Sequence, residues 1–190
     1  MAARITVAAA RSLAGATVLA SLVPVTAFAQ GPIAGTTVGA VFTSRVEEYA
    51  RLRGRLEEPL PALDEKRGAR PAMLTRRYLA SAIRAARTRA RAGTVFAPPV
   101  GEAFRHLIAQ RLSEVDPEGL RGWDEDLGVD IVVYEPVPAW SRLPIPDEYL
   151  GLFPELPDGI EYRMVNGALV LWDLHAEIVI DALPAAFVAR

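Results

Sequence analysis

The chain of 190 residues contains no cysteine, which excludes disulfide bonds and a lipid anchor attached to an N-terminal cysteine. Lysine occurs once, at Lys66, and histidine only twice, at His106 and His175. Arginine supplies almost all of the positive charge. Without covalent cross-links, the folded chain must be stabilised by its packed core alone.

Motifs for hydrolysis and nucleotide binding are also absent. The sequence has no G-x-S-x-G, no glycine-rich phosphate loop, and no serine with a plausible histidine and aspartate around it. The acidic run at 124–130 lacks the spacing of a twelve-residue calcium loop, so it indicates a solvated loop. These absences favour a non-enzymatic protein, and no cofactor is expected.

The first 29 residues have the layout of a secretory signal peptide. Arg4 and Arg11 precede an apolar run at 13–25, and small residues occupy Ala27 and Ala29. Polar residues interrupt the run and no stop-transfer charge cluster follows it, so no stable membrane span is expected after cleavage. The prediction is an exported chain that begins at residue 30 and is periplasmic or secreted. Retention of the segment as an anchor is the alternative.

The rest of the chain predicts one α+β domain over residues 44–190, preceded by a flexible leader at 30–43. The helical part, 44–116, contains three predicted helices. The first spans 45–58 and starts at a capping box formed by Ser44 and Glu47; the others span 71–92 and the residues from Pro98 towards Pro117. The middle helix is expected to end at Gly93, and its predicted core side consists of Leu74, Tyr78, Leu79, Ala82, Ile83, Ala86 and Ala90.

A proline-rich crossing and an antiparallel β-meander are predicted over 129–183. A strand at 129–134 is expected first, then an extended crossing with a short helical turn at 147–153. The three strands of the meander lie between Gly159 and Leu183, and Asn166-Gly167 predicts a type I′ turn. One face of the meander is expected to pack on the helices, and it consists of Tyr162, Met164, Leu169, Leu171, Ile178 and Ile180. Trp172 is expected on the opposite face, under the crossing.

Charge divides unevenly along the chain. Residues 30–112 contain 15 basic and 7 acidic side chains, whereas residues 113–190 contain 4 basic and 16 acidic ones. The two halves could face each other and neutralise their charges across the contact. Alternatively, each half could recruit a charged partner. Contact between the halves is the preferred interpretation.

Two groups of residues are candidate sites. Arg84, Arg87 and Arg91 lie on the arginine-rich predicted helix and could bind an anionic or protein partner. Nucleic acid is not expected there, because no aromatic side chains are interleaved with the arginines. Asp173 and His175 lie two residues apart in the last turn of the meander and could hold a metal ion or small ligand.

The C-terminal tail, with Y-R-M-V, L-V-L-W-D and I-V-I-D-A-L after a proline-rich approach, resembles that of small exported bacterial proteins of unknown function. It is also loosely similar to the tail of RcnB-type periplasmic proteins of nickel and cobalt homeostasis, over about 50 residues. The resemblance implies no activity and no metal role, because the matching positions are apolar or structural. The sequence therefore predicts an exported binding or interaction module that is not an enzyme. A periplasmic accessory protein with a metal or ligand near Asp173 and His175 is the alternative.

Overall fold

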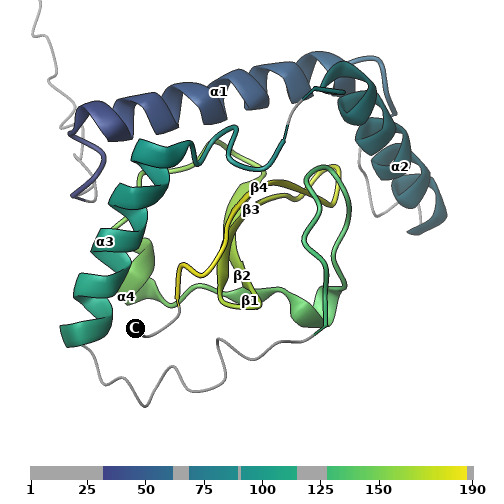
Figure 1. Ribbon diagram of the computed structural model, residues 1–190. Coiled ribbons are helices and arrows are strands. Elements are labelled where there is room, and N and C mark those ends of the chain that lie inside the picture. Colours follow the sequence, from purple (N-terminus) through teal and green to yellow (C-terminus); the bar gives the residue numbers. More distant parts are fainter. Residues whose placement is uncertain (1–31, 62–68, 90, 115–127, 188–190) are drawn as a thin grey trace, which may run out of the picture.

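The computed structural model describes residues 32–61, 69–89, 91–114 and 128–187 (Figure 1). Helices α1 (Thr37–Glu57), α2 (Ala69–Ala86) and α3 (Pro98–Glu114) precede a four-stranded antiparallel sheet. This arrangement confirms the predicted α+β class. The predicted signal peptide and residues 124–127 of the acidic run lie outside the described residues. Within the described part of the chain, no helix has the length and hydropathy needed to span a membrane.

The sheet is a meander of neighbouring strands in the order β1-β2-β3-β4. Its main strands are β2 (Ile160–Val165), β3 (Ala168–Asp173) and β4 (Ile178–Leu183), and a short β1 (Leu143–Pro144) pairs with β2 at one edge. Asn166 and Gly167 have φ values of 48° and 69°, and both type I′ turn positions require positive φ. The predicted meander and its first turn are therefore confirmed.

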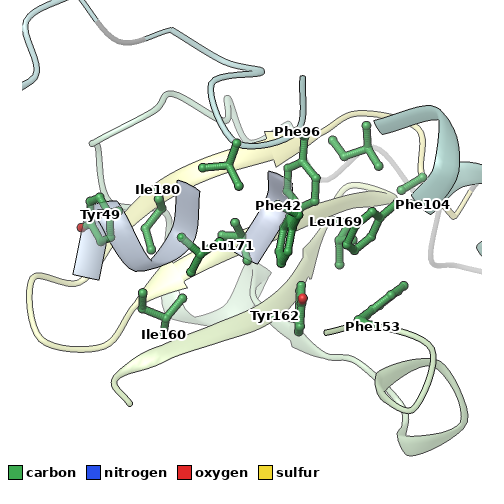
Figure 2. Packing of buried hydrophobic residues seen from close by; sticks show 14 of the residues in the cluster. Phe42, Tyr49, Phe96, Phe104, Phe153, Ile160, Tyr162, Leu169, Leu171 and Ile180 are labelled. Atoms are coloured by element: carbon green, nitrogen blue, oxygen red, sulfur yellow. The ribbon is translucent and has the colours of Figure 1, made fainter. Parts of the chain in front are cut away.

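The helices cover one face of the sheet, as predicted. Phe42 of α1 lies at the centre of this core, with ring centroids 5.7 Å from Phe96, 4.9 Å from Phe104 and 6.2 Å from Tyr162 (Figure 2). Leu171 is fully buried on the same side. All six side chains predicted for this face belong to the main cluster of buried residues.

The opposite face of the sheet packs against the proline-rich crossing. Trp172 and Val179 share a second apolar cluster with Val137 of the crossing, and the Arg142 guanidinium lies 4.2 Å from the Trp172 ring centroid. The crossing also contains a 3₁₀ turn, η3 (Ala139–Ser141), and the short helix α4 (Asp147–Leu150), which agrees with the helical turn expected near 147–153. Trp172 is thus buried under the crossing, as predicted.

The strand predicted at 129–134 is wrong. The chain meets β4 through only two backbone hydrogen bonds here, from Tyr134 N to Val179 O (2.7 Å) and from Val179 N to Glu135 O (3.0 Å). Tyr134 has a φ of 66°, in the left-handed region that a continuing strand does not use. Pro136 follows and has no N–H to donate, so the pairing stops.

Two helix boundaries also differ from the sequence-based prediction. α1 begins at Thr37, because the Thr36 hydroxyl accepts a hydrogen bond from Gly39 N (3.1 Å) and Phe42 fills the core. The predicted flexible leader is therefore helical from residue 37 onward, and Ser44 lies inside the helix. α2 ends at Ala86, and Gly93 does not cap it. Instead, Gly93 lies in the loop that leads to α3, and its backbone N–H donates a hydrogen bond to the Asp181 carboxylate (2.8 Å).

Candidate functional site

A cleft of about 660 Å³ lies beside α2. One wall is the exposed side of α2, and the other is formed by two segments next to the outer edge of β4. Glu135 and Pro136 come from the crossing, and residues 176–178 come from the end of the last turn of the meander and the start of β4. The residues that line it are Met73, Leu74, Arg76, Arg77, Tyr78, Ala80, Ser81, Arg84, Glu135, Pro136, Ala176, Glu177 and Ile178.

α2 has two apolar sides, and only one of them packs into the protein. Ala72, Leu79 and Ile83 are buried towards the core, together with the small Thr75. By contrast, Met73, Leu74 and Tyr78 expose 48%, 42% and 64% of their surfaces. The prediction that Leu74, Tyr78 and Ala86 belong to the core side is therefore wrong, and Ala90 lies outside the described residues. α2 lies at the periphery of the molecule (Figure 1), and its buried residues include Ala72, Leu79 and Ile83.

The charged side chains of the cleft are mostly paired across it. Arg76 Nε lies 3.5 Å from Glu177, and Arg84 Nη1 lies 3.0 Å from Glu135 and donates to the Tyr134 carbonyl (3.1 Å). Both pairs join the basic half of the chain to the acidic half, which agrees with the preferred interpretation of the charge asymmetry. Arg77 is exposed and forms no ion pair with any residue that the structure describes. The cleft therefore presents one guanidinium for an incoming anion.

The three arginines predicted as an anion site do not lie together. Only Arg84 lines the cleft. The Arg87 guanidinium lies 6.0 Å from the ring centroid of Tyr49 and 5.8 Å from that of Tyr134, so it packs on an aromatic pair. Burial raises the pKa of the Tyr134 hydroxyl, and the adjacent Arg87 partly opposes this effect. Arg91 is exposed beyond the end of α2 and is not among the lining residues.

Asp173, one of the two candidate metal ligands, belongs to a closed polar cluster. Its side chain is fully buried, and one carboxylate oxygen accepts a hydrogen bond from the Tyr49 hydroxyl (2.6 Å). The other oxygen accepts from the backbone N–H groups of His175 (2.8 Å) and Ala176 (2.9 Å), and it lies 3.7 Å from Arg53 Nη1. Burial, and then the Asp173 charge, raise the pKa of Tyr49 strongly, so its hydroxyl remains a donor.

His175, the other candidate ligand, contacts α1 next to this cluster. Its Nδ1 lies 2.8 and 2.9 Å from the two carboxylate oxygens of Glu57. The His175 ring packs against the backbone of Gly159. A Cβ atom added at Gly159 would lie 2.7 Å from His175 Nε2 and 2.8 Å from Arg53 Nη1. Gly159 also has a φ of 76°, so both its backbone conformation and the space around it require glycine.

These contacts give the Asp173 and His175 turn a structural role. Tyr49, Arg53 and Glu57 follow one another at i, i+4 and i+8 on α1, so they form a polar stripe that holds α1 against the turn. Among the described residues, no group of three or more His, Cys, Asp or Glu side chains is arranged to hold a metal ion. The geometry of the described residues therefore adds no support to the metal prediction.

Replacing Tyr49 with phenylalanine tests this cluster. The change leaves a buried Asp173 oxygen without its hydrogen-bond donor, and we expect a loss of about 1.5–3 kcal/mol in the free energy of unfolding. Tyr78→Phe is the matched control, because its hydroxyl lies on an exposed residue and the change should stay within about 0.5 kcal/mol. Chemical denaturation of both variants measures the difference. Equal stability of the two would contradict the role given to Tyr49.

The sequence of α2 contained a signal for the cleft, but assigning all its apolar residues to one buried side of the helix hid this signal. Leu74 and Tyr78 lie four residues apart, and so do Met73 and Arg77, which places apolar groups and a guanidinium on adjacent lines of the helix. Nothing in the local sequence indicates that Glu135 and Glu177 would form the opposite wall. Comparisons with family models, with curated proteins and with solved structures find no match to this chain.

Proposed function

We propose that this protein is a non-enzymatic binding module that captures an anionic ligand in the cleft beside α2. The observation that carries the proposal is Arg77, exposed among the large apolar side chains of the cleft and without an ion pair to any described residue. The cleft volume of about 660 Å³ lies within the range of about 300–1,000 Å³ that is typical of ligand sites. Arginine suits this role, because its planar fork binds carboxylate or phosphate oxygens in pairs.

The edges of the sheet are less suited to bind a partner than the cleft. Tyr134 and Glu135 already make backbone hydrogen bonds to Val179 in β4. At the other edge, β1 is two residues long and includes Pro144, which cannot donate to an added strand. Addition of a partner strand therefore has little free backbone to use, and this favours the cleft.

The chemistry of the cleft favours binding over catalysis. Catalytic sites typically gather groups with shifted pKa values in an accessible cleft. Here the buried Tyr49 and Tyr134, whose pKa values are raised, line the core and not the cleft. The described lining contains no histidine, and Glu135 and Glu177 are both paired with arginines. We propose that this binding takes place after export, because residues 1–29 have the pattern of a signal peptide.

Fluorescence titration with 8-anilinonaphthalene-1-sulfonate tests the proposal, because this probe has one anionic group and an apolar body. We expect saturable binding to the folded protein and binding about fivefold weaker in Arg77→Gln, since an exposed charge contact contributes up to about 1 kcal/mol. Arg89→Gln removes the same charge from an exposed residue that does not line the cleft, and it should bind like the wild type. No saturable binding, or equal binding by all three proteins, would contradict the proposal.

A further inference from the structure

We infer that the cleft takes a single free amphiphile with one negative charge, such as a medium-chain fatty-acid carboxylate, with its head group on Arg77. This inference rests on the proposed binding function and names the class of ligand. It follows from three properties of the described lining: the net charge, the placement of the carboxylates and the apolar side chains that remain exposed.

The charge of the lining matches one anionic group. Arg76 and Arg84 are paired with Glu177 and Glu135, at 3.5 and 3.0 Å, so these four charges cancel. Arg77 remains and gives the described lining a net formal charge of +1. A ligand with a single carboxylate therefore neutralises the cleft, whereas a polyanion would add uncompensated negative charge.

The placement of the two glutamates acts against a second anionic group. Glu135 and Glu177 lie on the wall opposite α2, next to the outer edge of β4. A ligand anchored on Arg77 therefore extends either towards these carboxylates or along α2. In either direction a second negative charge would find no unpaired cation in the described lining, because Arg76 and Arg84 are already paired with these carboxylates, and this disfavours dicarboxylates and acidic peptides.

The apolar side chains suit a flexible hydrocarbon chain. Met73 and Leu74 precede Arg77 by four and three residues, so they lie beside it, one turn earlier on the helix. Met73 is 48% exposed and Leu74 is 42% exposed, and covering them removes apolar surface from water. Methionine adapts its shape to an irregular partner. Ala176 and Ile178 on the opposite wall are already buried, so the apolar surface left for a ligand to cover lies on α2.

Displacement of bound 8-anilinonaphthalene-1-sulfonate from the purified protein tests the inference, with all competitors kept below their micelle concentrations. We expect laurate to displace the probe, and decanoate to bind about tenfold more weakly, since each buried methylene changes affinity about threefold to fourfold. Dodecanol, which lacks the carboxylate, and dodecanedioate, which carries a second one, should each bind about fivefold more weakly than laurate. Arg77→Gln should remove the difference between laurate and dodecanol, whereas Arg89→Gln should retain it.

The other outcomes separate this inference from the proposed function. If octaglutamate displaces the probe in a manner that depends on Arg77 and laurate does not, the cleft binds anions but the amphiphile is wrong. Equal affinity for laurate and dodecanol would overturn the role of Arg77. Arg77-dependent binding to phosphatidylcholine vesicles containing phosphatidylglycerol, without displacement by laurate, would assign the cleft to a membrane surface. Failure of the probe and of every competitor to bind would overturn both proposals.

Circular dichroism and melting temperature should be unchanged in Arg77→Gln, because the residue is exposed.

Discussion

Asp181→Ala is expected to destabilise the protein by about 3–5 kcal/mol, because the carboxylate organises the loop between α2 and α3. Asp181 is fully buried in β4. One of its oxygens accepts from Gly93 N (2.8 Å) and Ala182 N (2.9 Å), and the other accepts from Val95 N (2.6 Å) and Phe96 N (2.8 Å). Alanine would leave these backbone donors without their acceptor and loosen the segment that places Phe96 in the core.

The amide variant sharpens this test. Asp181→Asn retains one acceptor oxygen but presents an NH₂ group to two of the four N–H donors, so an intermediate loss is expected. Asp130→Ala is the control, since Asp130 is exposed in the described chain and its removal should have little effect. Denaturant unfolding of the three variants should rank them as Ala, Asn and control, from least to most stable. A near-neutral Asp181→Ala would show that the loop does not depend on this carboxylate.

Leu171→Ala is expected to cost about 2–5 kcal/mol, the range for a large-to-small change in a packed core. Leu171 lies in the central strand of the meander, is fully buried, and shares the helix-facing cluster with Tyr49, Phe42 and Leu169 (Figure 2). The alanine side chain would leave a cavity between the sheet and the helices.

Leu174→Ala provides the comparison for Leu171→Ala, because it removes the same atoms three residues later in the chain. Leu174 lies in the last turn of the meander and is 40% exposed, so its loss should be about 0.5 kcal/mol or less. Equilibrium unfolding of both variants under the same conditions gives the difference directly. Similar losses in the two would show that Leu171 does not occupy the core between sheet and helices.

The meander could be predicted from sequence because its signals are local. Alternating side chains from Tyr162 to Ile180 set the two faces, and Asn166-Gly167 set the first turn, so the burial of Leu171 and Trp172 on opposite faces followed. The strand expected at 129–134 failed because apolar residues alone do not supply a pairing partner. There, a positive φ at Tyr134 and Pro136 after it limit the pairing to two hydrogen bonds.

The candidate site depends on contacts that sequence spacing does not contain. Asp173 was assigned to the last turn of the meander as a candidate metal ligand, and Asp181 was not singled out. Their hydrogen-bond partners lie far away in the chain, at Tyr49 and in the segment 93–96. Arg84 and Arg87 were expected to act together. They do not act together in the structure, because Arg84 forms an ion pair with Glu135. Arg87 instead packs on the rings of Tyr49 and Tyr134. The cleft likewise exists only because α2 lies opposite Glu135 and Glu177.

The central claim, that the cleft beside α2 is the binding site, is tested most directly by nuclear magnetic resonance. The purified, ¹⁵N-labelled protein is titrated with 8-anilinonaphthalene-1-sulfonate, and the amide shift changes are assigned to residues. We predict that the changes gather at residues 73–84, at Glu135 and at residues 176–178, the segments that line the cleft. Changes centred on Tyr49, Asp173 and Gly159, or on the exposed Trp140, would contradict the account.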